Sequence, residues 1–244
     1  MDASVFLRKV EASLSEKDKK RLKKLSSSVG RDNAVALLGM HSRTSAAEIE
    51  MISEIMASFE DVRIFSVRHQ PRNVVFEGEG AGFKVRLHPQ YVVGKPVDHP
   101  HYSKERPQDN YWYIDFAIEL GRYYSGNWIR AAVVAIEYNG HIAHYVESNI
   151  RKSYMRDWGV FDQCGYVPLK VTPEHWRNQG GYFMKSINRH LKHHAIDMIY
   201  WSREFMEYRI RNQLETPDFV VQEKGGFLYA VPTINLITDV NNNS

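Results

Sequence analysis

The chain has a single cysteine, Cys164, and no long apolar run among its 244 residues. One thiol cannot form an internal disulfide or supply the several thiolates of a zinc cluster, and so low a cysteine content is typical of a reducing compartment. No stretch approaches the roughly 18 apolar residues that a membrane-spanning helix needs, and the N-terminus lacks the apolar core of a secretory signal. The sequence therefore predicts a cytoplasmic protein without a membrane partner.

An excess of charge of one sign is also lacking, as are internal repeats and low-complexity linkers. The Lys and Arg residues number 32 against 29 Asp and Glu, so the formal net charge is +3, which permits a nucleic-acid partner without requiring one. No helix-turn-helix, zinc-finger or RNA-recognition signature is present. We expect one compact domain, with a basic helical N-terminal region (1–60), an α/β core with a long C-terminal helix (61–215), and a hairpin with a tail (216–244).

Sequence periodicity predicts helices followed by a sheet. A Ser45-x-x-Glu48 capping box opens an amphipathic helix, on which Glu48 lies within the apolar stripe. Runs of β-branched and aromatic residues then predict strands at 62–68, 73–80, 82–93, 111–120 and 129–140. The remaining expected elements are a helix at 145–163, a strand at 166–171, a helix start at Thr172-Pro173-Glu174, a long helix at about 182–214 and a hairpin around Gly225-Gly226.

Two acidic residues lie at equal distances from a turn signal. Asp115 and Glu137 are each eleven residues from Gly126, the middle of Ser125-Gly126-Asn127, and partners in a hairpin are equally distant from its centre. We therefore expect the two acids to be direct cross-strand partners on one face. Alternation predicts a wholly apolar opposite face, made of Trp112, Ile114, Phe116, Ile118 and Leu120.

Further polar residues accompany this pair. Asn139 shares the face of Glu137, and His141 and His144 follow the strand end. Carboxylate and amide oxygens suit Mg²⁺ or Mn²⁺, which activates water and neutralises phosphate, so the pattern predicts metal-dependent phosphodiester hydrolysis. The alternative is that the acids are solvated residues of an exposed sheet face. Glu137 follows the apolar run AAVVAI, which is typical of a central strand and favours a site.

Four short motifs follow one another between residues 110 and 176: I-D-F-A with Asp115, A-I-E-Y-N-G-H with Glu137, a charged helix with Arg156-Asp157, and G-Y-V-P-L-K-V. Their order resembles that of the PD-(D/E)XK nuclease superfamily, and within it the very-short-patch-repair endonuclease and related bacterial domains with an E-x-D-G-x-x-H signature. The resemblance implies a restriction-endonuclease-like core, a mixed central sheet flanked by helices. It also implies Mg²⁺ or Mn²⁺ held by Asp115 and Glu137, and hydrolysis of DNA in bacterial repair, restriction, defence or a mobile element.

The chain departs from the superfamily pattern at one position. The usual lysine two residues after the second acid is Asn139 here, so Lys152 and Lys170 are candidates for a relocated cation, with His141 and His144 as alternatives suited to acid–base work. This departure leaves open a second interpretation, a nuclease-like subunit that binds nucleic acid or a partner without cutting.

The superfamily resemblance also bears on Glu48. In that superfamily an acid from the helix before the sheet can complete the metal site. Glu48 is the acid in that place here, although its role in the capping box already accounts for it.

Positive charge is distributed over several segments. The basic run from Lys17 to Lys24 is typical of a solvated helix face. The polar segment 94–110 leads into the strand of Asp115 and is long for a loop, so we expect substrate contacts there. The residues expected to contact nucleic acid are Lys95, His101, Lys104, Arg106, Arg151, Lys152 and Arg156. Whether the chain forms a homodimer through the stripe of its long helix or uses that stripe as core stays open.

Overall fold

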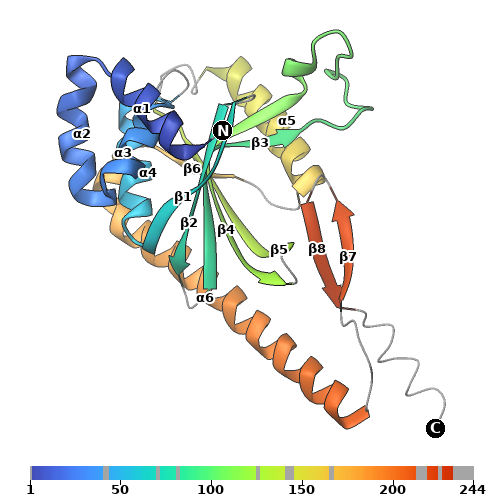
Figure 1. Cartoon of the computed structure of the whole chain (residues 1–244). Coiled ribbons are helices and arrows are strands. Elements are labelled where there is room, and N and C mark those ends of the chain that lie inside the picture. Colours follow the sequence, from blue (N-terminus) through green and yellow to red (C-terminus); the bar gives the residue numbers. More distant parts are fainter. Residues whose placement is uncertain are drawn as a thin grey trace.

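A six-stranded mixed sheet forms the centre of the computed structural model, with helices on both of its faces (Figure 1). The structure describes residues 2–40, 44–69, 72–80, 83–124, 127–140, 146–164, 168–212, 219–224 and 227–232. The strands are β1 (Glu60–His69), β2 (Arg72–Gly80), β3 (Phe83–Gly94), β4 (Tyr111–Tyr124), β5 (Asn127–Tyr138) and β6 (Leu169–Val171), and they lie in this order across the sheet. Neighbouring strands are antiparallel except β5 and β6, which are parallel. The expected α/β class is confirmed.

The helices of the described residues fall into an N-terminal group and two later helices. They are α1 (Ala3–Ser13), α2 (Glu16–Val29), α3 (Arg31–Leu38), α4 (Ala46–Met56), α5 (Glu147–Cys164) and α6 (Pro173–Asn212). A 3-10 turn, η1 (Pro107–Asp109), precedes β4, and β7 (Phe219–Lys224) and β8 (Phe227–Pro232) form the expected C-terminal hairpin. The helix start predicted at 172–174 and the helix predicted at 182–214 belong to one continuous helix, which the structure describes as far as Asn212. Gly180 and Gly181 do not interrupt it, because a helical glycine costs only about 1 kcal/mol.

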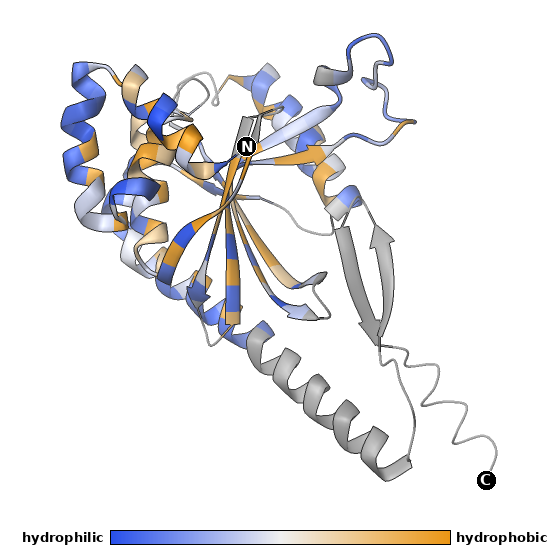
Figure 2. Cartoon of the chain, in the orientation of Figure 1, coloured by the Kyte–Doolittle hydropathy of each residue, from blue (hydrophilic) through white to orange (hydrophobic). Residues whose placement is uncertain are grey.

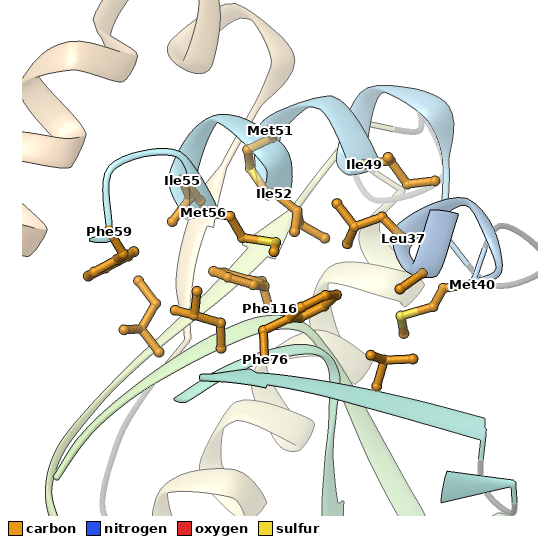
Figure 3. Packing of buried hydrophobic residues seen from close by; sticks show 14 of the residues in the cluster. Leu37, Met40, Ile49, Met51, Ile52, Ile55, Met56, Phe59, Phe76 and Phe116 are labelled. Atoms are coloured by element: carbon orange, nitrogen blue, oxygen red, sulfur yellow. The ribbon is translucent and has the colours of Figure 1, made fainter. Parts of the chain in front are cut away.

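The main core lies between one sheet face and helices α1 to α4 and α6. Residues of α4, among them Ile52 and Met56, pack on Phe76 and Phe116 of the sheet (Figure 3). Ile187 of α6 belongs to the same cluster, so the first part of the long helix stripe is core. Figure 2 shows α2 as largely hydrophilic, in keeping with its basic run, while the central strands are mostly apolar. Helices α1 to α4 therefore share the core of the sheet.

Strand β4 changes sides near Asp115, which corrects the predicted apolar face. Phe116, Ile118 and Leu120 belong to the main core, but Trp112 and Ile114 belong to a second cluster on the α5 side, with Tyr91 and Val160. The physical reason lies in the neighbouring strand. Gln90 of β3 has a left-handed backbone (φ 55°) and lies opposite Asp115 in register, between the pairs Pro89–Phe116 and Tyr91–Ile114. A non-glycine residue in this conformation breaks strand alternation.

Helix α5 approaches the sheet closely at Gly159. A methyl group there would collide with the outer atoms of the buried Trp112 ring. We expect Gly159→Ala to lower the free energy of unfolding by about 1–3 kcal/mol, because the ring has to move in a packed core. Gly181→Ala on α6 is the matched control, since no atom lies within 4 Å of its added carbon. It should raise stability by about 0.5–1 kcal/mol. Urea unfolding of both variants measures these changes, and changes of the same sign in the two free energies of unfolding would contradict the expectation.

Within the described residues, no helix is both long enough and apolar enough to cross a membrane.

Candidate active site

Asp115 and Glu137 meet where β4 begins and β5 ends. Phe116 pairs with Ile136, a register consistent with the equal spacing, and Asp115 and Glu137 are the residues next to this pair on the two strands. The turn itself differs from the expectation. Tyr124 pairs with Asn127, and an extra residue in β5 between Leu120–Ala132 and Gly121–Arg130 restores the register. One carboxylate oxygen of Asp115, Oδ2, accepts a hydrogen bond of 2.7 Å from the backbone N–H of Tyr138, which ties it to the end of β5.

Glu48 reaches the same region from α4. The expected capping box is present: Ser45 Oγ accepts from the Glu48 N–H, and Glu48 Oε2 accepts from the Ser45 N–H at 3.1 Å. Its other oxygen, Oε1, accepts from Gln90 Nε2 at 3.0 Å, and the side chains of both residues are buried. Gln90 thus connects the helix to the point where β4 changes sides. The cap fixes the backbone of Glu48, and the left-handed Gln90 fixes its carboxylate.

Glu137 is bound from the other side by α5. Arg156 Nη2 lies 3.1 Å from Glu137 Oε2 and 3.3 Å from Asp157 Oδ1, and Lys170 Nζ lies 2.6 Å from Asp157 Oδ2. Lys170 is also the direct partner of Glu137 across β5 and β6. The second oxygen of Glu137, Oε1, is buried and has no hydrogen-bond partner among the described residues. A buried carboxylate oxygen without a partner is costly and is typical of functional sites.

The electrostatics of the three acids show that they act on one another. Burial raises the pKa of Glu48 to about 8, and the charge of Asp115 adds to it. Burial and then Asp115 also raise the pKa of Glu137 to about 8, against the opposing effect of Arg156. Perturbation by burial together with a specific charged neighbour is frequent in active sites, and structural ion-pair networks show it as well. Near neutral pH the cluster therefore retains protons.

The same acidic residues supply oxygen atoms of the kind that divalent cations bind. No three His, Cys, Asp or Glu side chains in the described parts of the chain form a ready-made metal-binding group. The donor set nevertheless suits a hard divalent cation, because it consists of carboxylate oxygens, one of them buried without a partner. Asp115 and Glu137 are the residues that fit best, and Glu48 comes third because hydrogen bonds already occupy both of its oxygens.

The structure places the other predicted catalytic residues as follows. Asn139 is half-buried after β5, and its backbone N–H donates to Val171 O at 2.8 Å. Lys170 pairs with Asp157, which contacts Arg156, and it is also the strand partner of Glu137. Lys152 is exposed on α5. His141 and His144 lie outside the described residues, so the structure does not bear on them.

The predicted nucleic-acid contacts are only partly gathered near the acids. The 94–110 loop is ordered by Asn110, whose side chain bonds the backbone of Ser103 in both directions at 2.7 Å. Lys95 Nζ donates to the carbonyl oxygen of Asp109 within this loop, which gives it a structural role. The exposed members of the set are His101, Lys104, Arg106, Arg151 and Lys152. Arg156 is different, since it contacts Glu137 directly.

Sequence reasoning missed the roles of three residues. Gln90 follows Pro89 in the middle of a strand, and a proline inside a strand pattern is a signal of irregularity that could have marked it. Arg156 and Asp157 were identified as part of the charged helix, but their partners depend on how α5 lies on the sheet. No local pattern encodes that packing.

Comparisons with known proteins identify no relative: no protein-family model, curated protein or solved structure matches the chain.

Proposed function

We propose that the protein is a metal-dependent endonuclease of the PD-(D/E)XK type, which hydrolyses phosphodiester bonds of DNA. The observation that carries the proposal is the cluster of Glu48, Asp115 and Glu137, drawn from α4, β4 and β5. Burial and the charge of Asp115 raise the pKa of both Glu48 and Glu137, and one buried oxygen of Glu137 has no hydrogen-bond partner among the described residues. Like charges in a buried site lower stability unless a proton or a cation compensates them. A fold that keeps such a cluster is expected to use it.

The order of elements supports the same class. An acid on one strand is followed by a second acid on the next strand, a charged helix and a further strand, and an acid-bearing helix precedes the sheet. These are the parts that the sequence resemblance implies. They come together around one end of β5, as a single site requires.

In this proposal Asp115 and Glu137 hold Mg²⁺ or Mn²⁺, with Glu48 beside them. The bound ion supplies Lewis-acid activation of water and neutralisation of phosphate charge. Arg156 keeps Oε2 of Glu137 in place and brings a positive charge to the second acid, where the superfamily lysine is missing. Asp157 contacts Arg156 and is itself paired with Lys170, so this pair helps to orient Arg156. Because burial and Asp115 raise the pKa of Glu137 to about 8, a cation held there near neutral pH would take the place of a proton.

Cleavage of supercoiled plasmid tests the proposal. We expect nicking with Mg²⁺ or Mn²⁺ and none with EDTA, and Asp115→Asn should lower the rate at least about a hundredfold, since charge stabilisation in the site is lost. Asp32→Asn, an exposed acid on α3, is the matched control and should cut like the wild type. Binding of DNA by the wild type without any cleavage would favour the second interpretation, a nuclease-like binding subunit in which Asn139 marks the lost activity.

A further inference from the structure

Helix α5 exposes a row of large aromatic side chains on its outer side. Tyr154, Trp158 and Phe161 are 60%, 70% and 47% exposed, and their spacing of four and three residues places them on one helical stripe. Arg151, also exposed, precedes them on the same stripe. Scattered single apolar residues on a surface need no explanation, but a contiguous group of large ones marks a binding surface.

These side chains line a groove of about 580 Å³ between α5 and β6. Its walls include Tyr154, Trp158 and Phe161, and its lining also includes Pro168, Asp157 and Lys170. The rings of Trp158 and Phe161 stand at 88° to each other, with their centroids 6.3 Å apart, so they form a corner. Lys170 Nζ lies 5.0 Å from the centre of the Tyr154 ring. The groove therefore offers flat aromatic walls with a cation beside them.

Ion pairs connect the lining of the groove to Glu137 of the acid cluster. Asp157 and Lys170 line the groove, and Asp157 holds the Arg156 that contacts Glu137. If a phosphate of a bound nucleic-acid strand lies at Glu137, the bases next to that phosphate lie near the residues that surround Glu137. Aromatic walls accept every base because each base has a π-face.

We propose that this groove binds an unstacked nucleobase next to the phosphate at the acid cluster, so that the protein acts on single-stranded or locally unpaired nucleic acid. The inference rests on the proposed function for the path of the strand. Trp158 and Tyr154 supply stacking surfaces, and Arg151 and Lys170 supply positive charge for the adjoining backbone. The occupant is a polynucleotide strand rather than a second copy of the chain.

Binding without cleavage tests this directly. The full chain is mixed in EDTA with fluorescently labelled short oligonucleotides, as single-stranded DNA, single-stranded RNA and duplex DNA, and fluorescence anisotropy gives each Kd. We expect the wild type to prefer a single strand over duplex, with the DNA and RNA arms showing which sugar it accepts. Trp158→Ala should weaken single-strand binding on the order of tenfold, and Trp158→Phe about twofold, because a ring is retained.

Met155→Ala is the matched control, because Met155 is also 70% exposed on α5 but is not one of the residues that line the groove. Its Kd should equal that of the wild type, and thermal melts should show all variants folded. The proposal is overturned if the wild type binds no single strand, if Trp158→Ala binds as well as the wild type, or if that variant changes only the sedimentation of a dimer. Cleavage by a protein whose Trp158 variants bind normally would retain the proposed function and remove this inference. Binding that depends on the ring of Trp158, without any cleavage, would retain this inference and remove the proposed function.

Discussion

Replacing Glu137 with Gln is expected to abolish metal-dependent cleavage and, at the same time, to stabilise the metal-free protein. Glu137 is buried, its Oε1 has no hydrogen-bond partner among the described residues, and Asp115 opposes its ionisation. Gln keeps the shape of the side chain and removes the charge. The cluster then loses a source of repulsion, while the site loses a ligand that a divalent cation requires.

The stability gain should depend on pH. The pKa of Glu137 rises from an ordinary 4.5 to about 8 in the folded protein. The folded state thus holds this proton more strongly than the unfolded state. Its stabilising contribution is complete below pH 4.5 and is lost as the pH rises to about 8. The advantage of Glu137→Gln over the wild type should therefore grow between about pH 5 and pH 8, to on the order of 2 kcal/mol, or ~5 °C in Tm.

Thermal melts in EDTA across this pH range and plasmid cleavage in Mg²⁺ measure the two effects. Glu16→Gln, an exposed acid on α2 with 84% of its side chain accessible, is the control and should change neither. Loss of cleavage with lowered stability would point to a structural ion pair with Arg156. Cleavage at the wild-type rate would remove Glu137 from the active site, and the proposed function with it.

The parts of the site that local sequence determines could be predicted. Glu48 is placed by its own capping box, and the Asp115–Glu137 register follows from a turn signal between two alternating strands. The register of the neighbouring Phe116–Ile136 pair agrees with this spacing through two compensating differences. The tight Tyr124–Asn127 pairing alone would place Phe116 opposite Ala135, and the extra residue in β5 shifts it back to Ile136. A bulge of this kind has no clear local signal.

The parts that depend on tertiary packing could not be predicted. Strict alternation assigned Trp112 and Phe116 to one face, but the left-handed Gln90 opposite Asp115 puts them in different clusters. That change of side is what allows α4 and α5 to reach one group of acids from opposite faces. Likewise, the cation at Glu137 is Arg156 because Gly159 lets α5 lie against Trp112. The packing of α5 on the sheet determines which cation contacts Glu137, and the spacing of residues in the sequence does not indicate that cation.

A second buried ionic cluster, next to Gln90 in β3, is expected to dominate stability. Glu119 of β4 accepts from Tyr91 at 3.2 Å and lies 3.3 Å from Arg130 Nη1 and 3.1 Å from His88 Nε2. These contacts join β3, β4 and β5. Glu119→Gln should lower the free energy of unfolding by about 3–5 kcal/mol, or ~10 °C in Tm, because it leaves Arg130 buried without its counter-charge.

The effect should disappear in acid. Burial alone would raise the pKa of Glu119, but His88, Arg130 and the Tyr91 hydroxyl outweigh it and lower the pKa from 4.5 to about 2. A depressed pKa contributes stability that is complete above pH 4.5 and is lost as the pH falls towards 2. Urea unfolding of the wild type and Glu119→Gln should therefore give a difference that shrinks over this interval.

Two further variants separate ionic pairing from simple side-chain loss. Glu79→Gln breaks the exposed pair with Lys84 on β2 and β3 and should leave Tm unchanged, because solvent screens such pairs. The double variant Glu119→Leu/Arg130→Met removes both buried charges and should recover most of the lost stability, as apolar replacements of buried pairs do elsewhere. If the double variant is less stable than Glu119→Gln, the cluster contributes through its hydrogen bonds to Tyr91 and His88 rather than through its charges.

Since Tyr91 adjoins Gln90, weakened cleavage in Glu119→Gln with unchanged carboxylates at the site would show that this cluster also holds the acids in position.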